Sequence, residues 1–215
     1  GLDAGLYLLN KGIFKRDDAQ VQSGLEIVRN IAERIRKMVM DILFCAKERE
    51  LQRERIDIRA FAEDVVRTVQ PLFGSKNVEL VCEFERDLGF FEVDAAMLRS
   101  ALINLLENAA DACAAEGSDK SYRTVFGIEA NAEVVGILVE DNGIGMTPEQ
   151  LKNLFTVFFS TKGSKGTGLG LYITDKIIRQ HGGTIAVDSA VGRGAKFGIM
   201  IHRRAARAEV HADGA

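Results

Sequence analysis

The first part of the chain is patterned as two amphipathic helices. Apolar residues recur at steps of four and three between residues 2 and 13, and again between residues 21 and 46. The second series consists of Val21, Leu25, Val28, Ala32, Ile35, Val39, Ile42 and Ala46. This spacing places one apolar stripe on each helix and predicts an antiparallel helical hairpin or a coiled-coil-like bundle. Because the second stripe is much longer than the first, we expect a further segment or a second subunit to cover the remainder.

A compact domain of helices and strands is predicted after the hairpin. Helical spacing of apolar residues predicts helices at 59–73, 94–115 and 168–181. Strands are predicted where apolar residues alternate or run together, namely at 78–84, 123–130, 134–140, 184–189 and 195–202. The chain is therefore divided into a hairpin at 1–50, a charged linker at 51–58, an α/β domain at 59–204 and an alanine-rich tail at 205–215, which we expect to be disordered.

The net charge and the cysteine content limit which kinds of partner and which cellular compartment are expected. The net charge of −3 gives no basic face, which argues against nucleic acid or an anionic membrane surface as a partner. The three cysteines lack paired spacing, which argues against a disulfide framework or a zinc site and fits a reducing cytoplasm. No apolar run is long enough to cross a bilayer. We therefore expect a cytoplasmic chain, and any membrane anchor of a longer protein is expected upstream of Gly1.

The long helix at 94–115 carries the first candidate for chemistry. Asn104, Asn108 and Asp111 are spaced four and three apart and so share one helix face. A carboxamide oxygen suits Mg²⁺, which prefers oxygen ligands and often shares its coordination with phosphates and water. The alternative is that these are polar residues facing solvent, and the spacing alone does not decide between the two.

A second candidate directly follows an apolar strand, at residues 140–146. A buried Asp141 could accept a hydrogen bond from the exocyclic amine of adenine, while the glycines would let the backbone approach the ring closely. The alternative is an ordinary turn at the end of the strand, because Asp-Asn-Gly is favourable turn sequence.

The third candidate is the glycine-rich stretch at 163–171, which leads into a predicted helix. Backbone amides freed by glycine, together with the helix amino terminus, could bind phosphate oxygens. Neither the Rossmann nor the Walker A pattern fits, because no βαβ unit surrounds the stretch and no Gly-Lys-Ser/Thr opens the helix. Three phenylalanines between Phe155 and Phe159 precede it, which suggests a lid hinged on an aromatic anchor. A flexible linker and simple core phenylalanines are the alternatives.

Four segments, taken in order, resemble the ATPase domain of histidine kinases. Residues 104–109 resemble its N box, 141–145 its first glycine box, 155–159 its F box and 166–171 its second glycine box. The resemblance covers about residues 55–202, and the helical hairpin resembles the dimerisation and histidine-phosphotransfer bundle of that family. It implies an α+β fold, a two-layer α/β sandwich of the Bergerat type, with ATP bound between the long helix and a mobile lid.

The resemblance also implies roles for individual residues. Asp141 would hold adenine, Asn108 would carry Mg²⁺, and Lys162 would reach the γ-phosphate, with Asn104 beside the metal. The implied nucleotide-binding set is Asn104, Asn108, Asp111, Asp141, Gly143, Gly145, Met146, Phe158, Lys162, Gly166, Thr167, Gly168, Leu169, Gly170 and Leu171. Asn104 and Lys162 are the implied catalytic residues. Position 111 is basic and touches phosphate in many relatives, so here that contact is either lost or made by Lys162.

The implied reaction is transfer of the γ-phosphoryl group of ATP to a histidine and then to an aspartate of a response regulator, within a homodimer formed by the N-terminal helices. The histidines present are His181, His202 and His211, and none lies in the hairpin. We therefore expect the acceptor about two helical turns upstream of Gly1, and we do not expect this chain alone to autophosphorylate. Two alternatives remain: an inactive kinase-like docking module, and another ATPase of the superfamily. The latter would hydrolyse ATP with a glutamate at the position of Asn104.

Overall fold

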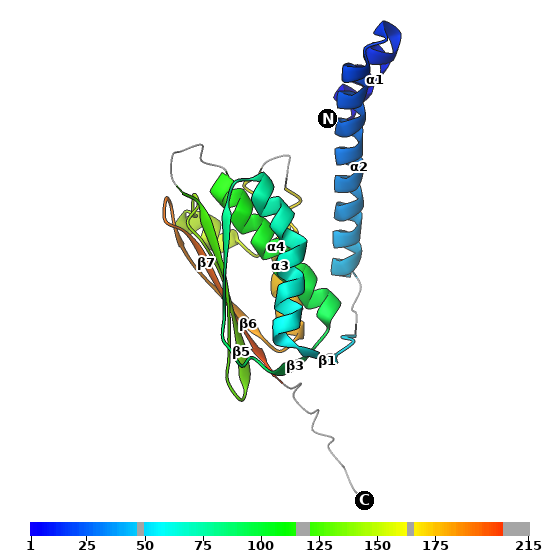
Figure 1. Cartoon of the computed structure of the whole chain (residues 1–215). Coiled ribbons are helices and arrows are strands. Elements are labelled where there is room, and N and C mark those ends of the chain that lie inside the picture. Colours follow the sequence, from blue (N-terminus) through cyan, green and yellow to red (C-terminus); the bar gives the residue numbers. More distant parts are fainter. Residues whose placement is uncertain (47–49, 115–120, 163–165, 204–215) are drawn as a thin grey trace, which may run out of the picture. The chain divides into compact units, whose positions relative to one another are not determined.

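The computed structural model describes residues 1–46, 50–114, 121–162 and 166–203. By their internal contacts they form two compact units, Gly1–Glu48 and Arg49–Ala215 (Figure 1). The predicted tail at 205–215 lies outside the described residues. Along the described parts of the chain, no helix combines the length and the apolar character needed to span a bilayer.

The first unit is the predicted helical hairpin, made of α1 (Leu2–Lys15) and α2 (Asp18–Ala46). The reversal occurs at Arg16, which adopts a left-handed conformation at φ 50° and closes α1 with backbone bonds to Ile13 and Gly12. The helices approach closely at glycines. A Cβ added to Gly24 would lie 2.7 Å from the backbone nitrogen of Leu9. Sequence analysis found the apolar stripes but not this glycine contact.

The second unit contains a five-stranded mixed sheet in the order β2-β4-β5-β7-β6. Its strands are β2 (Glu79–Phe84), β4 (Arg123–Ala130), β5 (Val134–Asp141), β6 (Thr184–Ala190) and β7 (Gly194–His202). The β2–β4 pair is parallel and the other pairs are antiparallel. Figure 1 shows the helices gathered on one face of the sheet. This arrangement confirms the predicted two-layer α/β sandwich.

The core lies between the sheet and three helices, α3 (Ile58–Ser75), α4 (Ala95–Ala114) and α6 (Gly170–Gln180). Fully buried side chains from both layers meet there, among them Phe73, Leu98, Leu102, Leu105, Phe126 and Ile178. Helix α3 begins where the side chain of Asp57 accepts a hydrogen bond from the backbone nitrogen of Ala60 at 2.8 Å. Apolar burial on one face of α4 leaves the other face of that helix for polar residues.

Part of the predicted linker is structured. Residues 54–57 form β1 (Glu54–Asp57), which pairs antiparallel with β3 (Phe90–Val93) in a separate two-stranded sheet. The charged side chains of β1 are exposed, so the strand has no apolar pattern by which it could be predicted. One of them, Arg55, places its guanidinium 4.3 Å from the ring centre of Phe90 on β3. The short helix α5 (Pro148–Asn153) was also missed. Thr147 and Gln150 begin it with a capping box.

Candidate functional site

Asn104, Asn108 and Asp111 lie on the face of α4 that turns away from the core, and all three are partly buried. The solvent-facing alternative is wrong for Asn104, because its amide nitrogen donates to the Thr174 hydroxyl of α6 at 3.1 Å. Helix α6 therefore lies along the polar face of α4 and fixes one of the two asparagines.

The loop after β5 packs against the carboxyl end of the same helix. Asp141 is 5% exposed, and one of its carboxylate oxygens accepts a hydrogen bond from the Gly143 backbone nitrogen at 2.9 Å. The Ile144 nitrogen donates to the Ala112 carbonyl of α4 at 3.2 Å. A Cβ on Gly143 would lie 2.5 Å from the Ala112 carbonyl carbon, so this close approach requires glycine.

Asn142, to which sequence analysis gave no role, is a structural residue. Its side-chain oxygen accepts from the Arg123 backbone nitrogen at 2.9 Å, and its amide donates to the Ser121 carbonyl at 3.0 Å. These bonds tie the loop after β5 to the segment that enters β4. They hold the neighbouring Asp141 at a fixed place at the end of the central strand β5.

The second glycine stretch reaches the same face of α4. Gly170 is the first residue of α6, and a Cβ placed there would overlap the side-chain oxygen of Asn104. Gly168 adopts φ +70°, and a side chain there would overlap the backbone of Phe158. Leu169 between them is buried, and its nitrogen donates to the Thr167 hydroxyl at 3.4 Å. The amino terminus of α6 thus lies beside Asn104, where a helix favours anions.

The segment around the phenylalanines has mixed burial. Phe155 and Met146 pack against the core, whereas Phe158 is 68% exposed and has a positive φ of 66°. Phe155 therefore packs as a core phenylalanine, which fits both the predicted anchor and its alternative, whereas Phe158 projects outward. Of the glycine-rich stretch, residues 163–165 lie outside the described residues.

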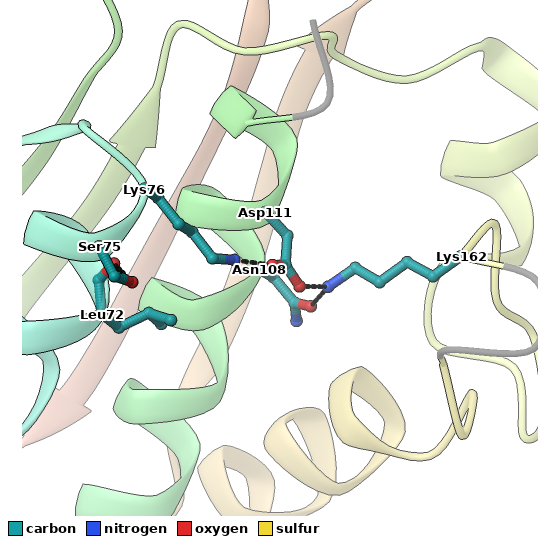
Figure 2. Close-up of polar contacts among 6 residues, drawn as sticks. All are labelled: Leu72, Ser75, Lys76, Asn108, Asp111 and Lys162. Atoms are coloured by element: carbon teal, nitrogen blue, oxygen red, sulfur yellow. Dashed lines mark hydrogen bonds and ion pairs between the residues drawn. The ribbon is translucent and has the colours of Figure 1, made fainter. Parts of the chain in front are cut away.

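Two lysines converge on the polar face of α4 (Figure 2). The Lys162 ammonium donates to the Asn108 side-chain oxygen at 2.6 Å and forms an ion pair with one oxygen of Asp111. Lys76, which follows α3, forms an ion pair with the other oxygen. Partial burial acts to raise the pKa of Asp111, but hydrogen bonds and charge from Lys162 and Lys76 outweigh it and lower that pKa. Nothing in the sequence singled out Lys76.

His181 is a buried structural residue. Its Nδ1 lies 2.8 Å from the Ile177 carbonyl oxygen, and its Nε2 accepts from the Asp94 backbone nitrogen at 3.0 Å. Both ring nitrogens are therefore engaged in the neutral tautomer with the proton on Nδ1. Burial, the largest influence, lowers the pKa of this histidine below its usual value. The folded domain leaves it no free nitrogen to accept a phosphoryl group.

A cavity of about 1490 Å³ lies at the other end of the sheet, near the β4–β5 turn, and none of the implied nucleotide-binding residues lines it. The arginines that line it already bind protein groups. Arg203 donates to the carbonyl oxygens of Phe90 at 2.9 Å and Leu88 at 2.6 Å. Arg53 donates to the carbonyl oxygens of Glu92 and Gln180. This cavity lies between the two sheets and is separate from the candidate nucleotide-binding residues.

The polar face of α4 therefore carries groups that can bind anions and, beside them, a group that can hydrogen-bond a nucleobase. The amino terminus of α6 lies beside Asn104, and two ammonium groups lie beside Asn108 and Asp111; such groups bind phosphate oxygens. The buried carboxylate of Asp141 lies in a glycine loop that packs against the same helix at Ala112. Carboxylates of this kind accept hydrogen bonds from amines. Three segments far apart in the sequence meet on one helix.

Residues 93–205 match the model of the family described as histidine kinase-, DNA gyrase B-, and HSP90-like ATPase. The match covers more than half of the chain, and the protein belongs to this family. Among its relatives is the signal transduction histidine-protein kinase AtoS of Escherichia coli (strain K12), which is 31% identical over 180 residues. That alignment covers 84% of this chain and 29% of AtoS. The chain spans about a third of the length of the curated relatives it matches.

Solved structures agree with the family match. Full-length ShkA in complex with AMPPNP superposes with a TM-score of 0.70 at 25% identity, over 88% of this chain and 39% of ShkA. Histidine kinase ThkA, in complex with the response regulator protein TrrA, gives a TM-score of 0.72 at 22% identity over 94% of this chain and 58% of ThkA. The matched residues form the ATP-binding catalytic domain of a histidine kinase, and the resemblance drawn from the four segments is confirmed.

Proposed function

We propose that this chain binds ATP with Mg²⁺ on the polar face of α4 and transfers the γ-phosphoryl group to a histidine of a longer protein. The observation that carries the proposal is the meeting of Asn104, Asp141 and Gly170 around one helix, although they lie in three separate segments. The phosphoryl group would then pass to an aspartate of a response regulator.

Adenine is assigned to the end of the site that contains Asp141. One oxygen of this buried carboxylate accepts the Gly143 backbone hydrogen, and the carboxylate can accept a second hydrogen from the adenine amine. Guanine has a carbonyl oxygen at the corresponding ring position and would be repelled. The glycine loop, with Gly145 in a left-handed conformation, lets backbone approach the ring.

The phosphates are assigned to the end where α6 begins. Asn108 is the proposed Mg²⁺ ligand, because its side-chain oxygen already binds the cationic ammonium of Lys162 at 2.6 Å and is therefore oriented toward a cation. Magnesium bound there would neutralise part of the charge on the phosphates. Gly166 to Leu171 would surround the phosphates, and Lys162 would stabilise charge on the departing γ-phosphoryl group.

The acceptor histidine is proposed to lie outside this chain. Neither helix of the hairpin contains a histidine, and both ring nitrogens of His181 are engaged. Asn104 cannot act as a general base for water, because a carboxamide does not take up a proton near neutral pH. This favours phosphoryl transfer over rapid hydrolysis, and an inactive docking module remains as an outcome of the experiments below.

A homodimer through the hairpin and a response-regulator partner complete the proposal. Apolar residues remain exposed along the hairpin, including Ile13, Phe14, Ile35, Val39 and Leu43. A second copy would cover such a surface. The structure of ThkA with TrrA is the precedent for a response-regulator partner. We also place the domain in the cytoplasm, where ATP and response regulators are available. A single-chain mass by light scattering at high concentration would argue against the dimer.

The adenine assignment is tested with Asp141→Asn. The amide oxygen would keep the Gly143 hydrogen bond and turn an NH₂ group toward the adenine amine, so that two donors face each other. We expect ATP affinity to fall about 10- to 100-fold and the preference for ATP over GTP to shrink. Asp188→Asn, an exposed change on β6, is the matched control. Equal loss in both variants, or an unchanged preference between ATP and GTP, would contradict the assignment.

Phosphoryl transfer is tested by incubating the chain with γ-labelled ATP and Mg²⁺, beside a version extended upstream. Acid-labile label on the extended chain alone supports an upstream histidine acceptor. Label on the present chain would contradict the structural role of His181 or point to His202 or His211. ATP binding without label on either version would support the docking module.

A further inference from the structure

Asp111 lies between two lysines that come from different parts of the fold. Lys76 follows α3, and Lys162 belongs to the segment after α5 that leads into the glycine stretch (Figure 2). Each lysine binds a different oxygen of the same carboxylate. The side chain of Lys76 is 21% exposed and that of Lys162 is 37% exposed, so Lys76 is the more enclosed member.

The cluster carries one more positive than negative charge. Both lysines pull the pKa of Asp111 below its ordinary value against the effect of partial burial, so the carboxylate is ionised at neutral pH. One lysine is sufficient to neutralise Asp111. The second leaves an excess positive charge next to Asn108, on the face assigned to the phosphates.

Lys162 occupies the oxygen that Mg²⁺ would need. Its ammonium lies 2.6 Å from the Asn108 side-chain oxygen. A bound Mg²⁺ sits about 2.0–2.1 Å from each oxygen ligand. Two cations cannot share that oxygen at such distances without strong repulsion. Binding of a magnesium nucleotide therefore requires Lys162 to leave Asn108, and its movement toward the phosphates also breaks the ion pair with Asp111.

We propose that Asp111 and Lys76 act as a pair of positioning residues: Asp111 holds Lys162 over Asn108 before nucleotide binds, and Lys76 neutralises Asp111 once Lys162 has moved to the phosphates. The inference rests on the proposed nucleotide site. Without Lys76, the departing Lys162 would leave a bare carboxylate facing the phosphates. Such a charge would repel the nucleotide and also bind Lys162 more firmly.

The test measures affinity for ATP with Mg²⁺, by calorimetry, in Lys76→Met, Asp111→Asn and the double variant. Lys196→Met is the matched control, because Lys196 also forms an ion pair, with Glu140 at 3.5 Å, and its strand β7 contributes none of the proposed site residues. We expect Lys76→Met to weaken binding about tenfold, allowing for partial solvent screening. Asp111→Asn should bind at least as tightly as the unchanged chain. The double variant should match Asp111→Asn, and Lys76→Arg should bind normally.

The outcomes separate three conclusions. Equal affinity of Lys76→Met and Lys196→Met would overturn the inference. An equal loss from Lys76→Met with or without Asp111→Asn would also overturn it, because Lys76 would then act on the nucleotide directly. If circular dichroism shows that Lys76→Met does not fold, the test rests on Asp111→Asn. A tenfold loss of ATP affinity in Asp111→Asn would then overturn the proposal. Failure of the unchanged chain to bind ATP would instead refute the proposed function.

Discussion

Gly170→Ala separates the function of the site from the stability of the fold. The new Cβ would overlap the side-chain oxygen of Asn104, so that side chain must turn away and give up its 3.1 Å hydrogen bond to Thr174. Losing that bond costs about 0.5–1.5 kcal/mol. Replacing glycine by alanine in a helix returns up to about 1 kcal/mol. The two changes nearly cancel, so we expect the melting temperature to stay within about 4 °C.

Nucleotide binding should respond much more strongly. A carboxamide turned away from the phosphate end loses hydrogen bonds to charged groups, which contribute about 1.5–3 kcal/mol each. The expected loss of ATP affinity is therefore about 10- to 100-fold. The assay pairs calorimetric titration with thermal unfolding of the same sample. Gly74→Ala is the matched control, because an added Cβ at this helical position has no neighbour within 4 Å and should leave affinity unchanged.

A double-variant cycle tests the stated mechanism. If Gly170→Ala acts only by displacing Asn104, it should have no further effect on affinity in an Asn104→Ala background. An additional loss in that background would refute the steric argument and would mean that residue 170 contacts the nucleotide itself. A fall in melting temperature far beyond that of Gly74→Ala would also refute it, because the backbone would then have moved.

Two further predictions concern stability. Folding lowers the pKa of His181, so the imidazole binds a proton more readily in the unfolded chain than in the folded one. The free energy of unfolding should therefore fall as pH drops below about 6.5, with a slope up to about 1.4 kcal/mol per pH unit. Urea unfolding at several pH values should show this slope, and His181→Gln should reduce it; an unchanged slope would contradict the buried neutral state. Gly24→Ala should destabilise the hairpin by about 1–3 kcal/mol through contact with the Leu9 backbone, seen as earlier loss of helical circular dichroism, unlike Gly74→Ala.

The apolar pattern of the sequence determined most of the secondary structure. Helix α4 was expected at 94–115 and spans Ala95–Ala114, because its buried leucines recur at helical spacing. Strand β1 was missed because charged side chains outnumber Ile56 and its pairing with β3 is not local in sequence. Helix α5 is too short for a period to emerge, although Thr147, Pro148 and Gln150 form a recognisable capping signal.

The chemical character of the site also came from the sequence, since residue type and spacing decide which groups could bind a base, a metal or a phosphate. Only the tertiary structure decided how they combine. It placed Gly170 in contact with Asn104 and let the Asn142 side chain connect the loop after β5 to the start of β4. It also paired both ring nitrogens of His181 with backbone groups and brought Lys76 to Asp111. These contacts join residues distant along the chain, and no local pattern encodes which side chains will meet. Local periodicity reports the face that a helix buries, whereas packing between elements determines the partners on its other face.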